Sequence, residues 1–128
     1  QGADIIMPVA GPVGEGAMAA AKEHKDTYVI GVDTDAFAKY EQYQDILLTS
    51  VVKTLDTAVF DTIKATKDGD WDATPYVGTL ENGGVGIAEF HNLDAKVPAE
   101  VKTKVEELKA QIIAGDLKVE SPSATAVK

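Results

Sequence analysis

The fold class is decided by residues 3–35, ADIIMPVAGPVGEGAMAAAKEHKDTYVIGVDTD, which predict a strand, a glycine-rich turn, a helix and a second strand. The apolar residues 5–9 have the length and composition of a parallel strand that is covered on both faces. Residues 16–24 are rich in alanine and favour a helix, because alanine loses no rotamer freedom on folding. Residues 28–32, YVIGV, form the second apolar strand. The stretch therefore predicts a parallel βαβ unit and an α/β fold.

The glycine-rich turn at residues 11–16 and the acidic residues 33–35 each follow the carboxyl end of a strand. Ligands bind at this rim in open α/β sheets. The turn leaves three interpretations open: a phosphate cradle, a plain tight turn, or close approach of the backbone at Gly11 to an uncharged ligand. Its spacing is neither the usual dinucleotide fingerprint nor a P-loop, and Glu15 would repel a phosphate.

Asp33 is the most informative residue of this rim. A carboxylate at a strand end can accept two charge-assisted hydrogen bonds from a vicinal diol, so ribose or another sugar would fit beside it. A dinucleotide-dependent enzyme would use an acidic residue in the same way, and a solvated loop aspartate is the remaining alternative. Asp33 therefore predicts a diol-binding site without separating a receptor from an enzyme.

The middle of the chain predicts a third strand at residues 46–49 and a helix that follows it. Ser50 is the expected N-cap of this helix, because its hydroxyl can accept a free backbone N–H of the first turn. Gly69 is the expected stop. Lys53 then falls in the first turn, where a cation opposes the helix dipole, a small cost that invites a functional reason.

Towards the carboxyl terminus, residues 75–80 and 85–90 are strand-like runs separated by 81–84, ENGG. The Asn-Gly pair accepts positive φ, so a β-hairpin is expected. Residues 98–115 predict the clearest helix, with proline at its start and glycine at its end. Residues 121–128 are small and polar and are expected to form a flexible tail.

The composition limits the classes of function. The chain has 128 residues, enough for one domain, and 21 acidic against 12 basic residues give a net charge of -9. This charge argues against binding to a nucleic acid backbone. The absence of cysteine excludes disulfides, thiol catalysis and zinc-thiolate sites. The sequence contains no apolar run of the length that a bilayer requires.

The sequence gives no sign of catalytic machinery. His24 is expected to be a helix C-terminal residue and His91 a solvated loop residue, and neither has a partner at metal-ligand spacing. The serines lack a G-x-S-x-G setting, so no nucleophile and base pair stands out. We therefore predict a protein that is not an enzyme, with no catalytic residue, no metal and no cofactor.

Several segments in unbroken order resemble the carboxyl-terminal part of the basic membrane protein (BMP) family, the PnrA-like substrate-binding lipoproteins of ABC transporters. They are GADIIMPVAG, the glycine turn with AAKE, YVIGVDTD, ILLTSVVK, ENGGVGIAEF and VPAEVKTKVEELKAQIIAGDLKV. The resemblance covers nearly the whole chain. It implies a type I periplasmic-binding-protein-like three-layer α/β sandwich with two lobes, present here only as a C-terminal fragment.

The resemblance also implies a division of the chain. Residues 1–45 would form a βαβ unit of the second lobe, and residues 46–72 a strand crossing to the first lobe with a helix of that lobe. Residues 73–120 would hold a crossing hairpin and a C-terminal helix of the second lobe, followed by the tail at 121–128.

In the family, the ribose of a purine nucleoside is held by an aspartate, a lysine and a glycine-rich turn, which fall here on Asp33, Lys53 and Gly11. The intact protein is then expected to bind a nucleoside without catalysis, through closure of its lobes, and to deliver it to an ABC permease. It would be an extracytoplasmic, membrane-anchored lipoprotein whose signal peptide and lipidation cysteine lie outside this chain.

Two other functions stay open. One is a fragment of a nucleotide-dependent, NAD-type oxidoreductase that uses the turn from Gly11 to Gly16 and Asp33. The other is the sugar-sensing effector domain of a transcription regulator, which shares the fold. We also expect the chain to self-associate, because an unpaired strand edge recruits another chain.

Overall fold

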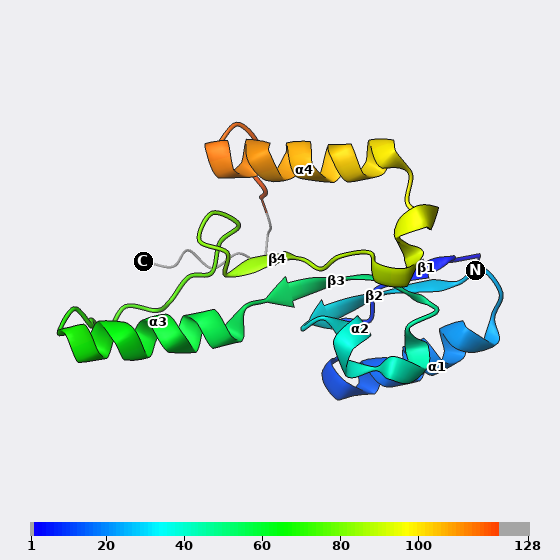
Figure 1. Ribbon diagram of the computed structural model, residues 1–128, viewed down its shortest axis with the longest axis horizontal. Coiled ribbons are helices and arrows are strands. Elements are labelled where there is room, and N and C mark those ends of the chain that lie inside the picture. Colours follow the sequence, from blue (N-terminus) through cyan, green and yellow to red (C-terminus); the bar gives the residue numbers. More distant parts are fainter. Residues whose placement is uncertain (1, 121–128) are drawn as a thin grey trace. The chain divides into compact units, whose positions relative to one another are not determined.

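The computed structural model describes residues 2–120 (Figure 1), so the predicted tail at 121–128 lies outside the described residues. The chain divides into two compact units. The first unit contains the residues up to Lys53 together with Gly86–Pro98, and the second contains Thr54–Val85 and the residues from Ala99 onward.

The first unit is built on strands that form one sheet in the order β1-β2-β3-β4. Their bounds are Ile5–Ile6, Tyr28–Asp33, Leu47–Lys53 and Val85–Ile87. β1 pairs parallel with β2, and β2 pairs parallel with β3. Helix α1, Gly14–Glu23, connects β1 to β2, so the predicted βαβ unit and the α/β class are confirmed.

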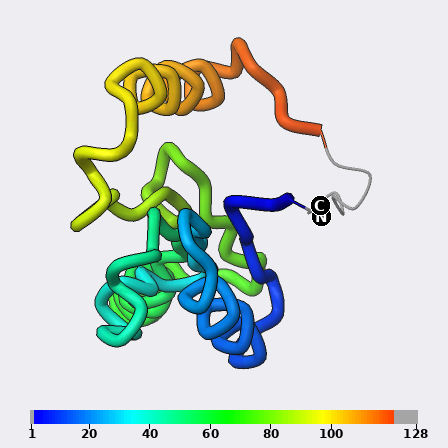
Figure 2. Tube along the Cα trace, turned by 90° about the vertical axis from the view of Figure 1, so that its right-hand side faces the viewer, coloured from blue at the N-terminus to red at the C-terminus, as the bar shows by residue number. Residues whose placement is uncertain are grey.

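Short helices complete this unit: η1 at Gly11–Val13, α2 at Ala36–Lys39, η2 at Glu41–Tyr43 and η3 at His91–Lys96. α1 and α2 cover the same face of the sheet, as the two views of the chain show (Figures 1 and 2). Side chains from both helices and from the strands meet in one core, which contains Met18, Ala21, Val29, Ala36, Ile46 and Leu47. This core joins the beginnings of β2 and β3 to α1 and α2.

The first strand is shorter and more exposed than its sequence predicts. The apolar run at residues 5–9 contributes only Ile5–Ile6 to the sheet, and Val9 is 74% exposed. β1 lies at the edge of the described sheet, so it has one strand neighbour instead of two. Ile5 is also 47% exposed and Ile6 is only half-buried, so the expectation of a strand covered on both faces is wrong.

The third strand is longer than predicted, and this corrects two expectations. β3 continues through Lys53, and the helix that follows, α3, begins at Leu55 with Thr54 as its N-cap. Ser50 is therefore not an N-cap, because it pairs with Gly31 of β2 inside the sheet. Lys53 is the last strand residue, so it does not oppose the dipole of a helix from its first turn.

The predicted hairpin is also wrong, because residues 75–80 form no strand and only β4 is extended. The side chain of Asn82 takes the place of a ladder. Its Oδ1 accepts from the N–H groups of Thr79 at 2.8 Å and Gly84 at 2.9 Å, and its Nδ2 donates to the carbonyl of Val77 at 2.9 Å. The turn residue Gly83 has φ +71°, as its sequence predicts.

The helices of the second unit end where their glycines predict. α3, Leu55–Asp68, stops at Gly69 with φ +82°, and α4, Ala99–Ala114, stops at Gly115 with φ +78°. Both glycines occupy the left-handed region that β-carbons disfavour. Neither these nor any other helix among residues 2–120 is long and apolar enough to cross a membrane.

Helix α3 leaves its large apolar side chains uncovered. Leu55, Val59, Phe60 and Ile63 are between 59% and 66% exposed, whereas the small residue Ala65 is half-buried. We call these four large residues the apolar face of α3. An amphipathic helix normally turns such a face towards a core, so this one is unusual for the surface of a folded chain.

Candidate functional site

The candidate site begins at the carboxyl end of β2, where the chain turns sharply after Asp33. Asp33 has φ +72°, in the left-handed region, and the N–H of Thr34 donates to the carbonyl of Val32 at 3.0 Å. Aspartate tolerates this conformation better than most residues other than glycine. The turn brings the Asp33 side chain to the rim of the sheet.

Lys53 reaches this carboxylate from the end of the neighbouring strand. Its Nζ lies 2.8 Å from Oδ1 of Asp33, and the two side chains are 60% and 49% exposed. The parallel register, which places Asp33 opposite Val52, makes the two strands end together. An exposed ion pair contributes only about 0–1 kcal/mol to stability, so folding does not require this pair.

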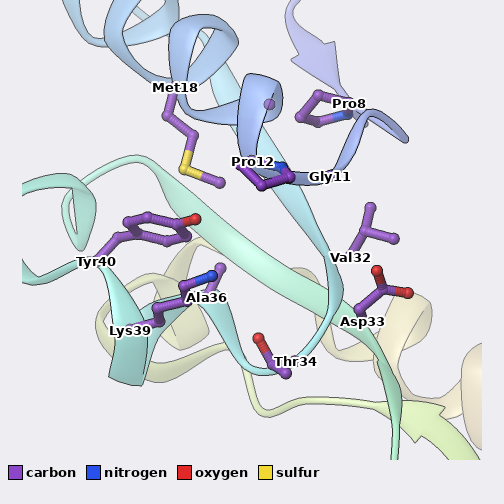
Figure 3. A pocket seen from close by; sticks show the side chains of 11 residues that line it. Pro8, Gly11, Pro12, Met18, Val32, Asp33, Thr34, Ala36, Lys39 and Tyr40 are labelled. Carbon is purple, nitrogen blue, oxygen red and sulfur yellow. The ribbon is translucent and has the colours of Figure 1, made fainter.

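Gly11 and Asp33 line the same cavity, which has a volume of about 180 Å³. Figure 3 shows Val32 and Asp33 on one side of it, with Gly11 and Pro12 on the neighbouring η1 segment. Gly11 has φ +56°, and a β-carbon there would meet no atom within 4 Å. The turn therefore needs glycine for its backbone conformation and leaves open space above it.

The opposite side of the cavity is formed by residues that sequence reasoning missed. Met18 and Tyr40 face the cavity there, and Lys39 of α2 also lines it (Figure 3). The Nζ of Lys39 lies 4.9 Å from the centre of the Tyr40 ring, within the range of a cation–π contact. The spacing of Phe37, Tyr40 and Tyr43 by three residues is the sequence signal for aromatic side chains near this rim.

The loop behind Asp33 is held by His91, whose expected role as a solvated residue is wrong. Its Nε2 lies 2.9 Å from Oδ2 of Asp35, and its ring stacks on Phe37 with 4.1 Å between centroids. The His91 side chain is only 23% exposed. Asp35 also accepts from the N–H of Phe37 at 3.1 Å, which caps the first turn of α2. This contact across the chain could not be read from residue spacing.

Two pKa shifts lie away from the rim. At the other end of β2, the Nζ of Lys96 donates to the hydroxyl of Tyr28 at 2.7 Å, and this hydrogen bond raises the pKa of Lys96. In the second unit, hydrogen bonds from the side chain and backbone of Thr74 lower the pKa of Asp72. Neither shift belongs to a residue of the candidate site.

The rim offers little to a metal ion or a phosphate. Among residues 2–120, no group of three or more histidine and acidic side chains could hold a metal ion. Glu15 lies in the first turn of α1, directly after the glycine turn. Its negative charge opposes the attraction that a helix N-terminus exerts on an anion.

Solved structures with a similar fold cover most of this chain. A solute-binding protein of an ABC transporter system from Aeropyrum pernix K1 matches with TM-score 0.74 and 23% identity over 97% of this chain and 42% of its own. A transcriptional activator of the comK gene from Bacillus halodurans matches with TM-score 0.75 and 20% identity over 91% of this chain and 39% of its own. An ABC transporter solute-binding protein from Conexibacter woesei matches with TM-score 0.68 and 21% identity over 93% of this chain and 38% of its own. These matches show the α/β fold of the solute-binding proteins.

Sequence relatives are closer. A CD4+ T-cell-stimulating antigen from Listeria innocua is 35% identical over 131 residues, and its counterpart from Listeria monocytogenes is 34% identical over 131 residues. Each match covers 92% of this chain and 36% of the relative, so the chain spans about a third of the length of these curated relatives.

A family model described as ABC transporter substrate-binding protein PnrA-like matches residues 1–121. The match includes the βαβ unit, the rim with its aspartate and lysine, and both long helices. The chain therefore belongs to the Bmp family of PnrA-like substrate-binding proteins.

Proposed function

We propose that this chain supplies the ribose-binding part of an ABC transporter receptor that captures a purine nucleoside. The observation that carries the proposal is the 2.8 Å pair between Asp33 and Lys53, at a rim where Gly11 and Asp33 line one cavity. These three residues are the ones to which the family resemblance assigns the ribose, and they come from three separate segments.

The chemistry of the pair suits a diol. Nζ of Lys53 forms an ion pair with Oδ1 of Asp33 at 2.8 Å, and the Asp33 side chain is 49% exposed. Oδ2 is therefore available to a ligand hydroxyl, and the ammonium group can donate to the oxygen of the neighbouring hydroxyl. Hydrogen bonds to a charged group contribute about 1.5–3 kcal/mol each, more than neutral ones do.

The size of the cavity indicates that it holds only part of the ligand. Its volume of about 180 Å³ is smaller than the roughly 300–1,000 Å³ of ordinary small-molecule sites. The purine base would then be bound by a part of the receptor outside this chain. In the intact receptor, closure around the ligand would present the loaded protein to a permease.

Family membership supports the remaining parts of this proposal. The receptor would work outside the cytoplasm, anchored to the membrane as a lipoprotein, and would not catalyse a reaction. The chain would also self-associate through β1, whose outer edge lacks a strand partner in the described sheet. Sedimentation of the pure chain at increasing concentration tests this last point, and a monomer throughout would contradict it.

The central experiment is an NMR titration of the 128-residue chain with adenosine and with 2′,3′-dideoxyadenosine. Association costs at least about 4 kcal/mol, which consumes most of the gain from two or three charge-assisted hydrogen bonds. We therefore expect a dissociation constant of about 1 mM or weaker for adenosine. The shifts should centre on Asp33, Lys53 and Gly11, and the dideoxy compound, which lacks the diol, should bind more weakly.

Matched variants make the result specific. Asp33→Asn should abolish the difference between the two nucleosides. Asp45→Asn removes another ion-paired carboxylate, 3.3 Å from Lys22, and should leave the difference intact. Micromolar affinity for adenosine by this chain, or an unchanged difference in the Asp33 variant, would contradict the proposal. Parallel titrations with free ribose and with NAD separate the sugar-sensing and oxidoreductase alternatives.

A further inference from the structure

We propose that Ser50 is a positioning residue that holds Asp33 in the geometry of the ligand site. Ser50 lies in the middle of β3 with only 1% of its surface exposed. Its Oγ accepts a hydrogen bond from the N–H of Ala36 at 3.0 Å. This N–H is the first of helix α2, and Ala36 is itself 3% exposed. The bond thus ties the start of α2 to the neighbouring strand inside the core.

The approach between these two residues depends on a glycine. Gly31 of β2 stands opposite Ser50 in the parallel register. A β-carbon at Gly31 would lie 2.4 Å from Oγ of Ser50 and 2.6 Å from the β-carbon of Ala36, both closer than real contacts allow. Any other residue at this position would occupy the space through which the hydroxyl reaches the amide. Gly31, Ser50 and Ala36 therefore form one tightly fitted contact.

This contact fixes the loop that carries the candidate ligand residue. Only Thr34 and Asp35 separate Asp33, at the end of β2, from Ala36. A loop this short cannot move at one end without changing the backbone angles at the other. Asp33 keeps φ +72°, a conformation that costs free energy for a residue with a β-carbon. The hydrogen bond from Ala36 to Ser50 therefore keeps the Asp33 carboxylate directed at Lys53 and the cavity.

Asp33 contacts the ligand only under the function proposed above, so the ligand role of Ser50 rests on that proposal. The effect of Ser50 on the stability of this loop can be measured without any ligand. In Ser50→Ala the N–H of Ala36 stays buried and loses its acceptor. An unsatisfied buried donor costs roughly 1–3 kcal/mol, which corresponds to an opening of the loop that is about 5- to 150-fold more frequent.

The experiment measures amide hydrogen exchange of residues 33–37 in the full 128-residue chain. The matched control is Thr49→Val, which removes the neighbouring hydroxyl of the same strand. Thr49 donates to the carbonyl of Ala88 at 2.6 Å and has no hydrogen bond to the loop. We expect faster exchange at Ala36 and Phe37 in Ser50→Ala and unchanged exchange there in Thr49→Val. Should Ser50→Ala fail to fold, Ser50→Cys keeps the size and a weak acceptor and should show a smaller effect.

The ligand readout is the ratio of affinities for adenosine and 2′,3′-dideoxyadenosine. Ser50→Ala should lower this ratio towards that of Asp33→Asn, and the double variant should lower it no further. If Ser50 were of purely structural importance, its substitution would weaken the binding of both nucleosides equally.

Amide exchange rates in Ser50→Ala equal to those of the wild type would overturn the proposal. It would also be overturned if Asp33→Asn removes the preference for adenosine over 2′,3′-dideoxyadenosine while Ser50→Ala leaves that preference unchanged. If Asp33→Asn leaves the ratio unchanged, the proposed function fails and the ligand role of Ser50 fails with it. The exchange data then still decide whether Ser50 holds the loop.

Discussion

Gly31→Ala should destabilise the protein strongly although it adds one methyl group. The new β-carbon would lie 2.4 Å from Oγ of Ser50 and 2.6 Å from the β-carbon of Ala36. Overpacking a core costs typically about 1–3 kcal/mol. Displacing the Ser50 hydroxyl also breaks its bond to the buried Ala36 N–H, which adds about 1–3 kcal/mol. Since the two costs overlap in part, we expect a total loss of about 2–4 kcal/mol.

Urea unfolding followed by circular dichroism measures this loss. Dividing about 2–4 kcal/mol by an m-value of about 2 kcal/mol per molar predicts a midpoint lower by roughly 1–2 M. Gly16→Ala is the matched control, because Gly16 lies within α1 and its β-carbon would meet nothing within 4 Å. It should stabilise the chain by about 0.5–1 kcal/mol. A Gly31→Ala midpoint at or above that of the wild type would refute the packing described for β2 and β3.

Three further substitutions test other contacts. His91→Ala removes the bond to Asp35 and an aromatic stack, so its urea midpoint should reveal a loss of about 1–2 kcal/mol. Tyr28→Phe removes the contact that raises the pKa of Lys96. A raised pKa stabilises the fold below the unfolded value of about 10.4, so the difference from wild type should be present at neutral pH and shrink as pH rises through the folded pKa. Gly69→Ala places a β-carbon at φ +82° and should lower stability by about 1–2 kcal/mol in thermal unfolding.

Controls and contrary outcomes differ among these three. His24→Ala changes an exposed histidine and should be neutral within about 0.5 kcal/mol, so an equal loss in both histidine variants would count against the Asp35 contact. For Tyr28→Phe, a difference in stability from wild type that grows as the pH rises would contradict the upward direction of the Lys96 pKa shift. For Gly69→Ala, a gain in stability would mean that the α3 terminus does not need the left-handed conformation.

The parts that were predictable from sequence are those governed by neighbouring residues. The βαβ unit follows from two apolar runs around an alanine-rich helix, and the ends of α3 and α4 follow from Gly69 and Gly115. The choice of Asp33, Lys53 and Gly11 came from the family resemblance as well as from strand ends. Their roles in binding remain predictions, although Asp33 and Lys53 are in contact.

The errors lie where partners distant in the sequence decide. Ser50 has the chemistry of an N-cap, but the pairing of β3 with β2 continues past it. Its hydroxyl instead accepts a hydrogen bond from the N–H of Ala36, 14 residues away. His91 has no nearby partner in sequence, and its contact with Asp35 spans 56 residues. Residues 75–80 have strand propensity, but the Asn82 side chain occupies the backbone groups that a ladder would need. Local patterns contain no information on these pairings.

The apolar face of α3 affects how the purified chain should be judged. Dyes such as ANS become fluorescent on exposed apolar surface, and this signal is commonly taken as a sign of a molten globule. Four large side chains on one helix, each more than half exposed, would bind such a dye while the sheet and its core remain intact. Dye fluorescence from this protein would then report exposed native surface, and near-ultraviolet dichroism of its aromatic residues would test whether tertiary packing had been lost.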